Sequence, residues 1–259
     1  MEVGSLHRLG EKKMASQLLD VNISKKYSSM DVLDNLVFSV EENEFLVIVG
    51  PTGCGKTTLG NILSGIEKPT AGKVRIRGEI IDPHVHNISY VFQEPSCIPW
   101  YTMIEDVSMG LEIRGVDGAK AIQRAKDVIK LVDMAGFEDY YPWQISGGMK
   151  QRVAIARAYA TNPDLLIMDE PFGHLDAQTR YLMQIEIMRI WEQEKKTVVF
   201  ITNNIEEAVY LASRIIVLSK LPAHMKGEYT VDLPRPRDLT SPEFLEFRAT
   251  ITRECEIVE

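Results

Sequence analysis

The sequence predicts an α/β fold with a mainly parallel sheet, on the basis of three observations. Short apolar runs that are continuous rather than alternating are typical of strands covered on both faces. Four such runs span residues 45–49, 165–168, 198–202 and 215–218. Helical patterns lie between them, and strands that alternate with helices form a doubly wound core. A glycine-rich segment, Gly50–Thr57, separates the first run from an apolar segment that suits a helix.

Two helical patterns each carry an apolar stripe with residues three and four positions apart. In 119–134 the stripe is Ile122, Ala125, Val128, Ile129 and Val132, and in 178–193 it is Tyr181, Ile185, Met188 and Trp191. A helix with one apolar face packs that face on the core of a globular protein. We therefore interpret both stripes as core-facing.

The composition argues for a soluble protein and against a nucleic-acid binder, a membrane-spanning protein or a disulfide scaffold. The chain has 259 residues, 29 Lys and Arg, 37 Asp and Glu, and a net charge of −8. This balance argues against a nucleic-acid partner, because phosphate contacts need clustered positive charge. No apolar run approaches the roughly 20 residues of a spanning helix, the start lacks a signal peptide, and three cysteines are too few for a disulfide scaffold. We expect a soluble intracellular chain that reaches a membrane only through a partner.

The glycine-rich segment matches G-x-x-x-x-G-K-[ST], the pattern of a phosphate-binding P-loop. Glycines let backbone N–H groups close around phosphate oxygens, and the following helix N-terminus favours an anion. Lys56 can reach the β- and γ-phosphates of a nucleotide, and the Thr57 hydroxyl can ligate Mg²⁺. Cys54 is interpreted as a small residue that fills the loop. The expected ATP-binding residues here are Gly50, Pro51, Thr52, Gly53, Cys54, Gly55, Lys56, Thr57 and Thr58.

Two carboxylates, Asp169 and Glu170, end the apolar run 165–168. Asp169 is suited to hold Mg²⁺, directly or through water, and Glu170 to polarise an attacking water as general base. Alone, the pair could also start a surface turn before Pro171. With a P-loop upstream, the sequence favours a nucleotide-hydrolysing site with Lys56 and Glu170 as catalytic residues.

A second anion-binding turn lies at 145–149, Ile-Ser-Gly-Gly-Met, before a helical segment. A serine hydroxyl and two glycines at a helix N-terminus expose N–H groups to an anion. With the P-loop and Asp-Glu pair, this turn resembles the signature motif of the ATP-binding cassette (ABC) family, usually L-S-G-G-Q. Ile145 and Met149 depart from that pattern. The resemblance makes Ser146, Gly147, Gly148 and Met149 the residues that meet the nucleotide of a partner subunit.

The resemblance covers about Gln17 to the tail and implies further roles. Tyr27 matches the aromatic residue that stacks on adenine, Gln93 the glutamine that touches Mg²⁺, and Asp176 the acid of the loop that crosses to the second subunit. The implied fold is a RecA-like P-loop core with a helical signature subdomain and an N-terminal antiparallel strand region. The implied cofactor is Mg²⁺, held by Thr57, Gln93 and Asp169.

One position departs from the family pattern at the catalytic site. The family has a histidine in a segment like T-H-D, whereas this chain reads Thr202-Asn203-Asn204. An Asn amide can donate a hydrogen bond to a γ-phosphate but cannot carry a positive charge. We therefore hypothesise that Asn203 slows hydrolysis. The chain would pair with a fully equipped ATPase or form a slow homodimer.

Two segments are similar to the nitrate, sulfonate and taurine importer branch of the family. They are 96–100, Ser-Cys-Ile-Pro-Trp, and the tail from Val231 to Phe244. The branch implies two permease subunits, an external solute-binding protein, and a cytoplasmic position on the inner face of the membrane. The alternative is a soluble ABC-type ATPase that is not coupled to a permease.

These features divide the chain into five segments. Residues 1–16 are expected to form a flexible arm, 17–94 and 161–220 the two parts of the nucleotide-binding core, and 95–160 a helical lobe with the signature turn. The tail 221–259 contains Pro222, Pro234, Pro236 and Pro242. We expect this tail to be irregular, with a short helix near 243–250.

Overall fold

A computed structural model describes residues 16–256, so the predicted arm lies almost entirely outside the described residues. A six-stranded sheet forms the centre, in the order β10-β9-β3-β8-β7-β6. All neighbours in it are parallel except β10 and β9, which confirms the mainly parallel sheet. The strands are β3 (Phe45–Val49), β6 (Ile88–Val91), β7 (Leu165–Asp169), β8 (Thr197–Thr202), β9 (Arg214–Leu218) and β10 (Met225–Thr230).

The continuous apolar runs form the central strands because both faces of this sheet are covered. In β3, Phe45 and Val47 join one apolar cluster with the helices α2 to α7, whereas Leu46 and Ile48 join a second cluster on the opposite face. Every residue of β3, β7 and β8 is buried. Successive side chains of a strand point to opposite faces, so a strand buried twice must be apolar throughout.

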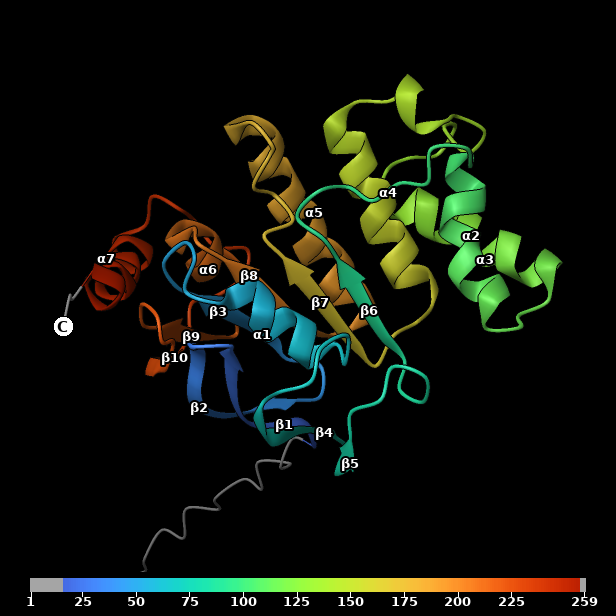
Figure 1. Ribbon diagram of the computed structural model, residues 1–259. Coiled ribbons are helices and arrows are strands. Elements are labelled where there is room, and N and C mark those ends of the chain that lie inside the picture. The colour runs from blue at the N-terminus through green and yellow to red at the C-terminus, as the bar shows by residue number, and fades with distance from the viewer. Residues whose placement is uncertain (1–15, 257–259) are drawn as a thin grey trace, which may run out of the picture.

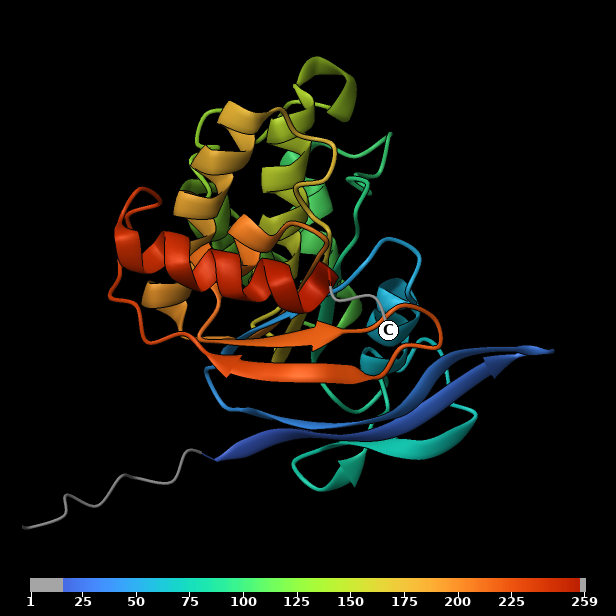
Figure 2. The same ribbon diagram turned by 90° about the vertical axis from the view of Figure 1, so that its left-hand side faces the viewer.

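The second sheet is antiparallel, with the order β2-β1-β4-β5. It lies with α1 (Lys56–Leu63) on one face of the central sheet (Figures 1 and 2). In β1, Val21 and Ile23 are buried while Asp20 and Asn22 are exposed, as expected of a half-covered sheet. This sheet is the antiparallel region that the family resemblance implied. Its strands are β1 (Gln17–Tyr27), β2 (Met30–Glu41), β4 (Ala71–Ile76) and β5 (Glu79–Ile80).

Residues 95–160, the helical lobe, contain helices and no strand. Thr102 and Glu105 form a capping box at the start of α2, and the Asp117 side chain caps α3. A buried ion pair between Arg157 and Asp106, 2.8 Å long, joins α4 to α2. The division of the chain at 94, 160 and 220 stays a prediction. The elements of the lobe are α2 (Met103–Ile113), α3 (Gly118–Leu131), the 3-10 helix Pro142–Gln144 and α4 (Gly147–Ala160).

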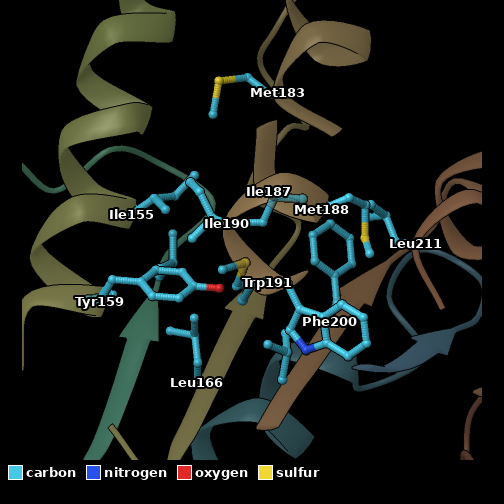
Figure 3. Close-up of a cluster of buried hydrophobic side chains, with 14 of the residues drawn as sticks. Ile155, Tyr159, Leu166, Met183, Ile187, Met188, Ile190, Trp191, Phe200 and Leu211 are labelled. Carbon is cyan, nitrogen blue, oxygen red and sulfur yellow. The ribbon is translucent and has the colours of Figure 1, made fainter. Parts of the chain in front are cut away.

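The stripe predicted for 119–134 faces the core, although Ile122 is only half-buried. The stripe predicted for 178–193 is wrong in its first half. In α5 (Ala177–Glu194), Tyr181 and Ile185 are 43% and 40% exposed. The core face instead runs through Met183, Ile187 and Ile190 to Trp191, against Phe200 (Figure 3). The helix is therefore turned by about one position relative to the prediction.

The tail is more regular than predicted. It contains β10 and α7 (Pro242–Glu256), and α7 packs on α6 (Ile205–Leu211) (Figure 2). The predicted helix near 243–250 is present and longer than predicted, whereas the prediction of an irregular tail was wrong because proline was counted against the whole segment. Pro222 precedes β10, Pro234 and Pro236 lie between β10 and α7, and Pro242 starts α7, where a missing N–H costs nothing.

Across residues 16–256, no helix has the length and apolarity that crossing a bilayer requires.

Candidate functional site

The P-loop joins the carboxyl end of β3 to the start of α1, as predicted (Figure 1). Gly55 precedes the helix with a φ of 105°, a conformation that L side chains rarely adopt. A Cβ on Gly55 would also lie 2.7 Å from Val32 Cγ1 of β2. The loop is thus packed against the antiparallel sheet so closely that only glycine fits. Gly53 also has a positive φ, 79°, but faces open space.

Lys56 is a buried cation at the centre of the site. Its Nζ donates to the carbonyl oxygens of Gly50 and Pro51, each at 3.0 Å, and lies 3.4 Å from Glu170 Oε1. The Lys56 side chain is 4% exposed. The P-loop and Glu170, the predicted general base, therefore meet at an ion pair.

Asp169 is buried at the end of β7, and only one of its carboxylate oxygens accepts a hydrogen bond. The Tyr90 hydroxyl donates to Oδ2 at 3.2 Å, whereas Oδ1 is buried and has no hydrogen-bond partner. Burial raises the pKa of Asp169, and the neighbouring Thr57 hydroxyl acts in the opposite direction. An unpartnered carboxylate oxygen near a hydroxyl fits Mg²⁺, which binds few protein ligands and takes the rest from phosphate and water. Within residues 16–256, no group of three or more His, Cys, Asp or Glu side chains could hold a metal ion.

Glu170 directly follows β7, and Asn203 directly follows the adjacent strand β8. The Asn203 amide nitrogen lies 3.4 Å from Glu170 Oε2 and 3.4 Å from Thr52 Oγ1. Glu170 has a positive φ of 42°, and its backbone N–H donates to Ile201 O at 2.8 Å. Asn203 therefore bridges the P-loop and the predicted general base.

Gln93 and Tyr27 lie at two margins of the site. Gln93 follows β6 and lies beside Gly173, where a Cβ would be 3.3 Å from its Nε2. Within residues 16–256 no hydrogen bond joins Gln93 to the predicted metal ligands. Tyr27 is 41% exposed at the end of β1, with Lys25 Nζ 4.7 Å from its ring centroid. Burial raises the pKa of Tyr27, whose hydroxyl donates to Glu67, and the Thr58 hydroxyl acts against this rise.

Cys54 is 2% exposed, and burial raises the pKa of its thiol. This agrees with the interpretation of Cys54 as a residue that fills the loop.

The signature turn and Asp176 begin two helices. Ser146 caps α4 by accepting a bond from Met149 N at 3.3 Å, and a Cβ on Gly147 would meet open space. Asp176 caps α5 through Thr179 N at 3.0 Å. The described chain shows no hydrogen bond between residues 145–149 and the P-loop, and in Figure 1 α4 lies in the helical lobe, away from α1. One chain therefore brings Lys56, Asp169, Glu170 and Asn203 together but not the signature turn.

Comparisons with known proteins agree with this geometry. The family model described as ABC transporter matches residues 33–173. The chain is 46% identical to an uncharacterised ABC transporter ATP-binding protein, MJ0412, of Methanocaldococcus jannaschii, over 92% of this chain and 91% of that protein. The chain belongs to the ABC transporter family.

Two further relatives of this ABC ATPase are informative. The aliphatic sulfonates import ATP-binding protein SsuB of Bacillus cereus is 39% identical over 90% of this chain and 92% of its own length. A solved structure described as the dimeric structure of MJ0796, a bacterial ABC transporter cassette, has a TM-score of 0.72 at 32% identity. It covers 83% of this chain and 99% of that one. This chain is accordingly an ATPase subunit of a transporter.

Some residues of this ABC ATPase site were not identified from the sequence. Tyr90 bonds Asp169, and Thr202 Oγ1 donates to the buried Glu207 at 2.7 Å, just below Asn203. Asn204 caps α6 by accepting from Glu206 N at 2.9 Å. Only Asn204 had a local signal, because Asn with a Glu three residues later, here Glu207, is typical of a helix start.

Proposed function

We propose that this chain hydrolyses ATP to energise an importer for a small anionic or polar solute of the nitrate, sulfonate or taurine type. The observation that carries the proposal is the arrangement of Lys56, Asp169, Glu170 and Asn203 at the carboxyl edge of three adjacent parallel strands. That edge is where open α/β sheets bind their ligands.

In this proposal the P-loop holds the triphosphate. Lys56 exchanges its carbonyl partners for the β- and γ-phosphates, and Tyr27 stacks on the adenine. Thr57, Gln93 and Asp169 are the residues that would hold Mg²⁺. Mg²⁺ supplies charge neutralisation of the phosphates when it is bound. Glu170 polarises the attacking water as general base.

Asn203 is the residue that distinguishes this site. Its neutral amide can orient Glu170 and donate to the γ-phosphate, but it adds no positive charge to the transition state. Electrostatic stabilisation is usually the largest contribution to such a reaction. We therefore propose that the chain binds ATP normally and hydrolyses it slowly in its own site.

A second ATPase subunit completes each site in the proposal. Ser146, Gly147, Gly148 and Met149 meet the nucleotide held by the partner, and Asp176 lies in the segment that crosses between the subunits. The separation of the signature turn from the P-loop within one chain supports this arrangement, and so does the dimeric cassette among the solved relatives. ATP then favours closure through contacts that the open pair lacks.

A permease is the proposed membrane partner, reached through residues 93–102. Trp100 in this segment is 72% exposed, and an aromatic side chain of this kind is typical of an interface. Arg157 holds the segment by donating to Ser96 O at 2.8 Å. The sulfonate-import relatives support an import role, and an external solute-binding protein is a further part of the proposal. The chain would then lie in the cytoplasm, peripheral on the inner face of the membrane.

The proposal is tested with the purified chain and with cells. Lys56→Ala should abolish ATP binding, whereas Ser146→Ala should keep binding and lose ATP-dependent dimerisation in sedimentation. Arg75→Gln, on the outer β4, serves as a matched surface control. Ser146 variants that dimerise normally would contradict the composite site.

The alternative is an ABC-type ATPase without a permease. Affinity purification of the chain from membranes of its own cells separates the two readings. A polytopic membrane protein should co-purify with the unaltered chain and be lost with Trp100→Glu. Recovery of the chain with no membrane protein would favour the alternative.

A further inference from the structure

Two arginines of the tail, Arg235 and Arg237, are largely removed from solvent, and the site described above does not account for them. Arg237 is only 7% exposed, and Arg235 is half-buried. Neither guanidinium forms an ion pair within residues 16–256; their recorded hydrogen bonds go to carbonyl oxygens and one sulfur. Buried charges are normally paired, so another group must offset these two.

The offset comes from the C-terminal end of α6. Arg237 Nη1 donates to Val209 O at 2.7 Å and Tyr210 O at 2.9 Å, and Arg235 Nη2 donates to Leu211 O at 2.7 Å. The last carbonyls of a helix lack intrahelical partners and carry the negative end of its dipole. The tail therefore caps α6 with two cations.

The tail also holds α6 elsewhere. The Arg235 guanidinium lies 4.9 Å from the Trp191 ring centroid, which ties the cap to α5. Arg248 of α7 pairs with Glu206, in the first turn of α6, at 2.8 Å. The short helix is thus fixed at both ends by residues from 235–248.

The opposite end of α6 is the catalytic site. Asn203 directly precedes Asn204, the residue that caps the helix N-terminus. Both hydrogen bonds of the Asn203 amide are 3.4 Å long, at the weak limit for such bonds. The position of Asn203 is therefore set by the two elements that it joins, β8 and α6, more than by its own side-chain contacts.

We propose that Arg235 and Arg237 are positioning residues for ATP hydrolysis: by capping α6 they hold Asn203 against Glu170. The inference rests on the proposed function, in which Asn203 faces the transferred phosphate. Loss of the cap lets α6 shift and slows turnover. Nucleotide affinity is spared, because the P-loop is built on β3 and α1, which neither arginine contacts by hydrogen bond.

The test uses the full chain with Arg237→Gln and the milder Arg237→Lys, which keeps the charge but not the planar fork. Arg214→Gln is the matched control, because Arg214 is also largely buried. Its hydrogen bonds go to Glu44, Glu228 and the Ser39 carbonyl oxygen rather than to carbonyl oxygens of α6. Melting temperature, affinity for Mg-ATP and kcat are measured for each. We expect the kcat of Arg237→Gln to fall about tenfold, while its affinity for Mg-ATP stays within about twofold of that of the unaltered chain. The kcat of Arg237→Lys should be intermediate. Arg214→Gln should lose stability but keep its kcat.

A double-mutant cycle separates positioning from general destabilisation. If Arg237 acts through Asn203, Arg237→Gln should slow the unaltered chain but add no further loss to Asn203→Ala. An equal loss in both backgrounds would overturn the inference alone. An Asn203→Ala chain that turns over normally would overturn the inference together with the proposed role of Asn203.

Discussion

Replacing Asn203 by histidine tests how this site stabilises the transferred phosphate. The Asn203 amide makes two bonds of 3.4 Å, longer than the roughly 2.7–3.2 Å of a good N–H···O bond. A neutral hydrogen bond contributes about 0.5–1.5 kcal/mol, and one from a charged group about 1.5–3 kcal/mol. A gain of about 1–1.5 kcal/mol in the transition state raises kcat about five- to tenfold.

The assay is steady-state phosphate release at saturating Mg-ATP for the unaltered chain, Asn203→His and Asn203→Ala. We expect a higher kcat with unchanged KM for histidine, because residue 203 lies beside the P-loop rather than in it. The gain should fade as the pH rises past about 6.5, where a free imidazole loses its proton. Equal turnover of the histidine variant and the unaltered chain would refute the reasoning.

Three further changes test other parts of the structure. Gly55→Ala places a Cβ 2.7 Å from Val32 Cγ1 and should abolish ATP binding in an equilibrium titration, whereas Gly115→Ala, at φ 76° but in open space, should not. Burial raises the pKa of Glu207, so the folded chain binds this proton more tightly than the unfolded chain, and stability falls as the pH rises through the raised pKa. Glu207→Gln should therefore make the melting temperature depend less on pH, and an unchanged pH dependence would contradict this prediction. Cys54, 2% exposed, should be alkylated slowly by iodoacetamide and more slowly still with Mg-ATP, as followed by mass spectrometry; labelling as fast as that of a free thiol would be the contrary result.

The features that the sequence predicted well are local. Five adjacent apolar residues suffice to indicate a strand such as β3, because burial on both faces leaves no polar position. The P-loop and the Asp169–Glu170 pair are likewise short segments that begin or end a strand. Their chemistry follows from neighbouring residues, so no knowledge of distant contacts was needed.

The features that the sequence did not predict depend on distant contacts. Arginine side chains are mostly exposed in proteins, and only the position of α6 makes Arg237 buried. Tyr181 and Ile185 continue an apolar stripe, yet both are exposed because the core covers the neighbouring face of α5, which carries Met183. The contact between Asn203 and Glu170 joins residues that are 33 positions apart in the chain, and no local pattern indicates it.

The order of the central strands gives Asn203 an unusual influence. Because β8 lies between β3 and β7, the residue that directly follows β8 lies between the P-loop and Glu170, the proposed general base. A substitution at position 203 therefore changes a side chain that contacts both. The proposed role of Asn203 implies that exchange of this one residue changes the rate of hydrolysis while nucleotide affinity stays the same.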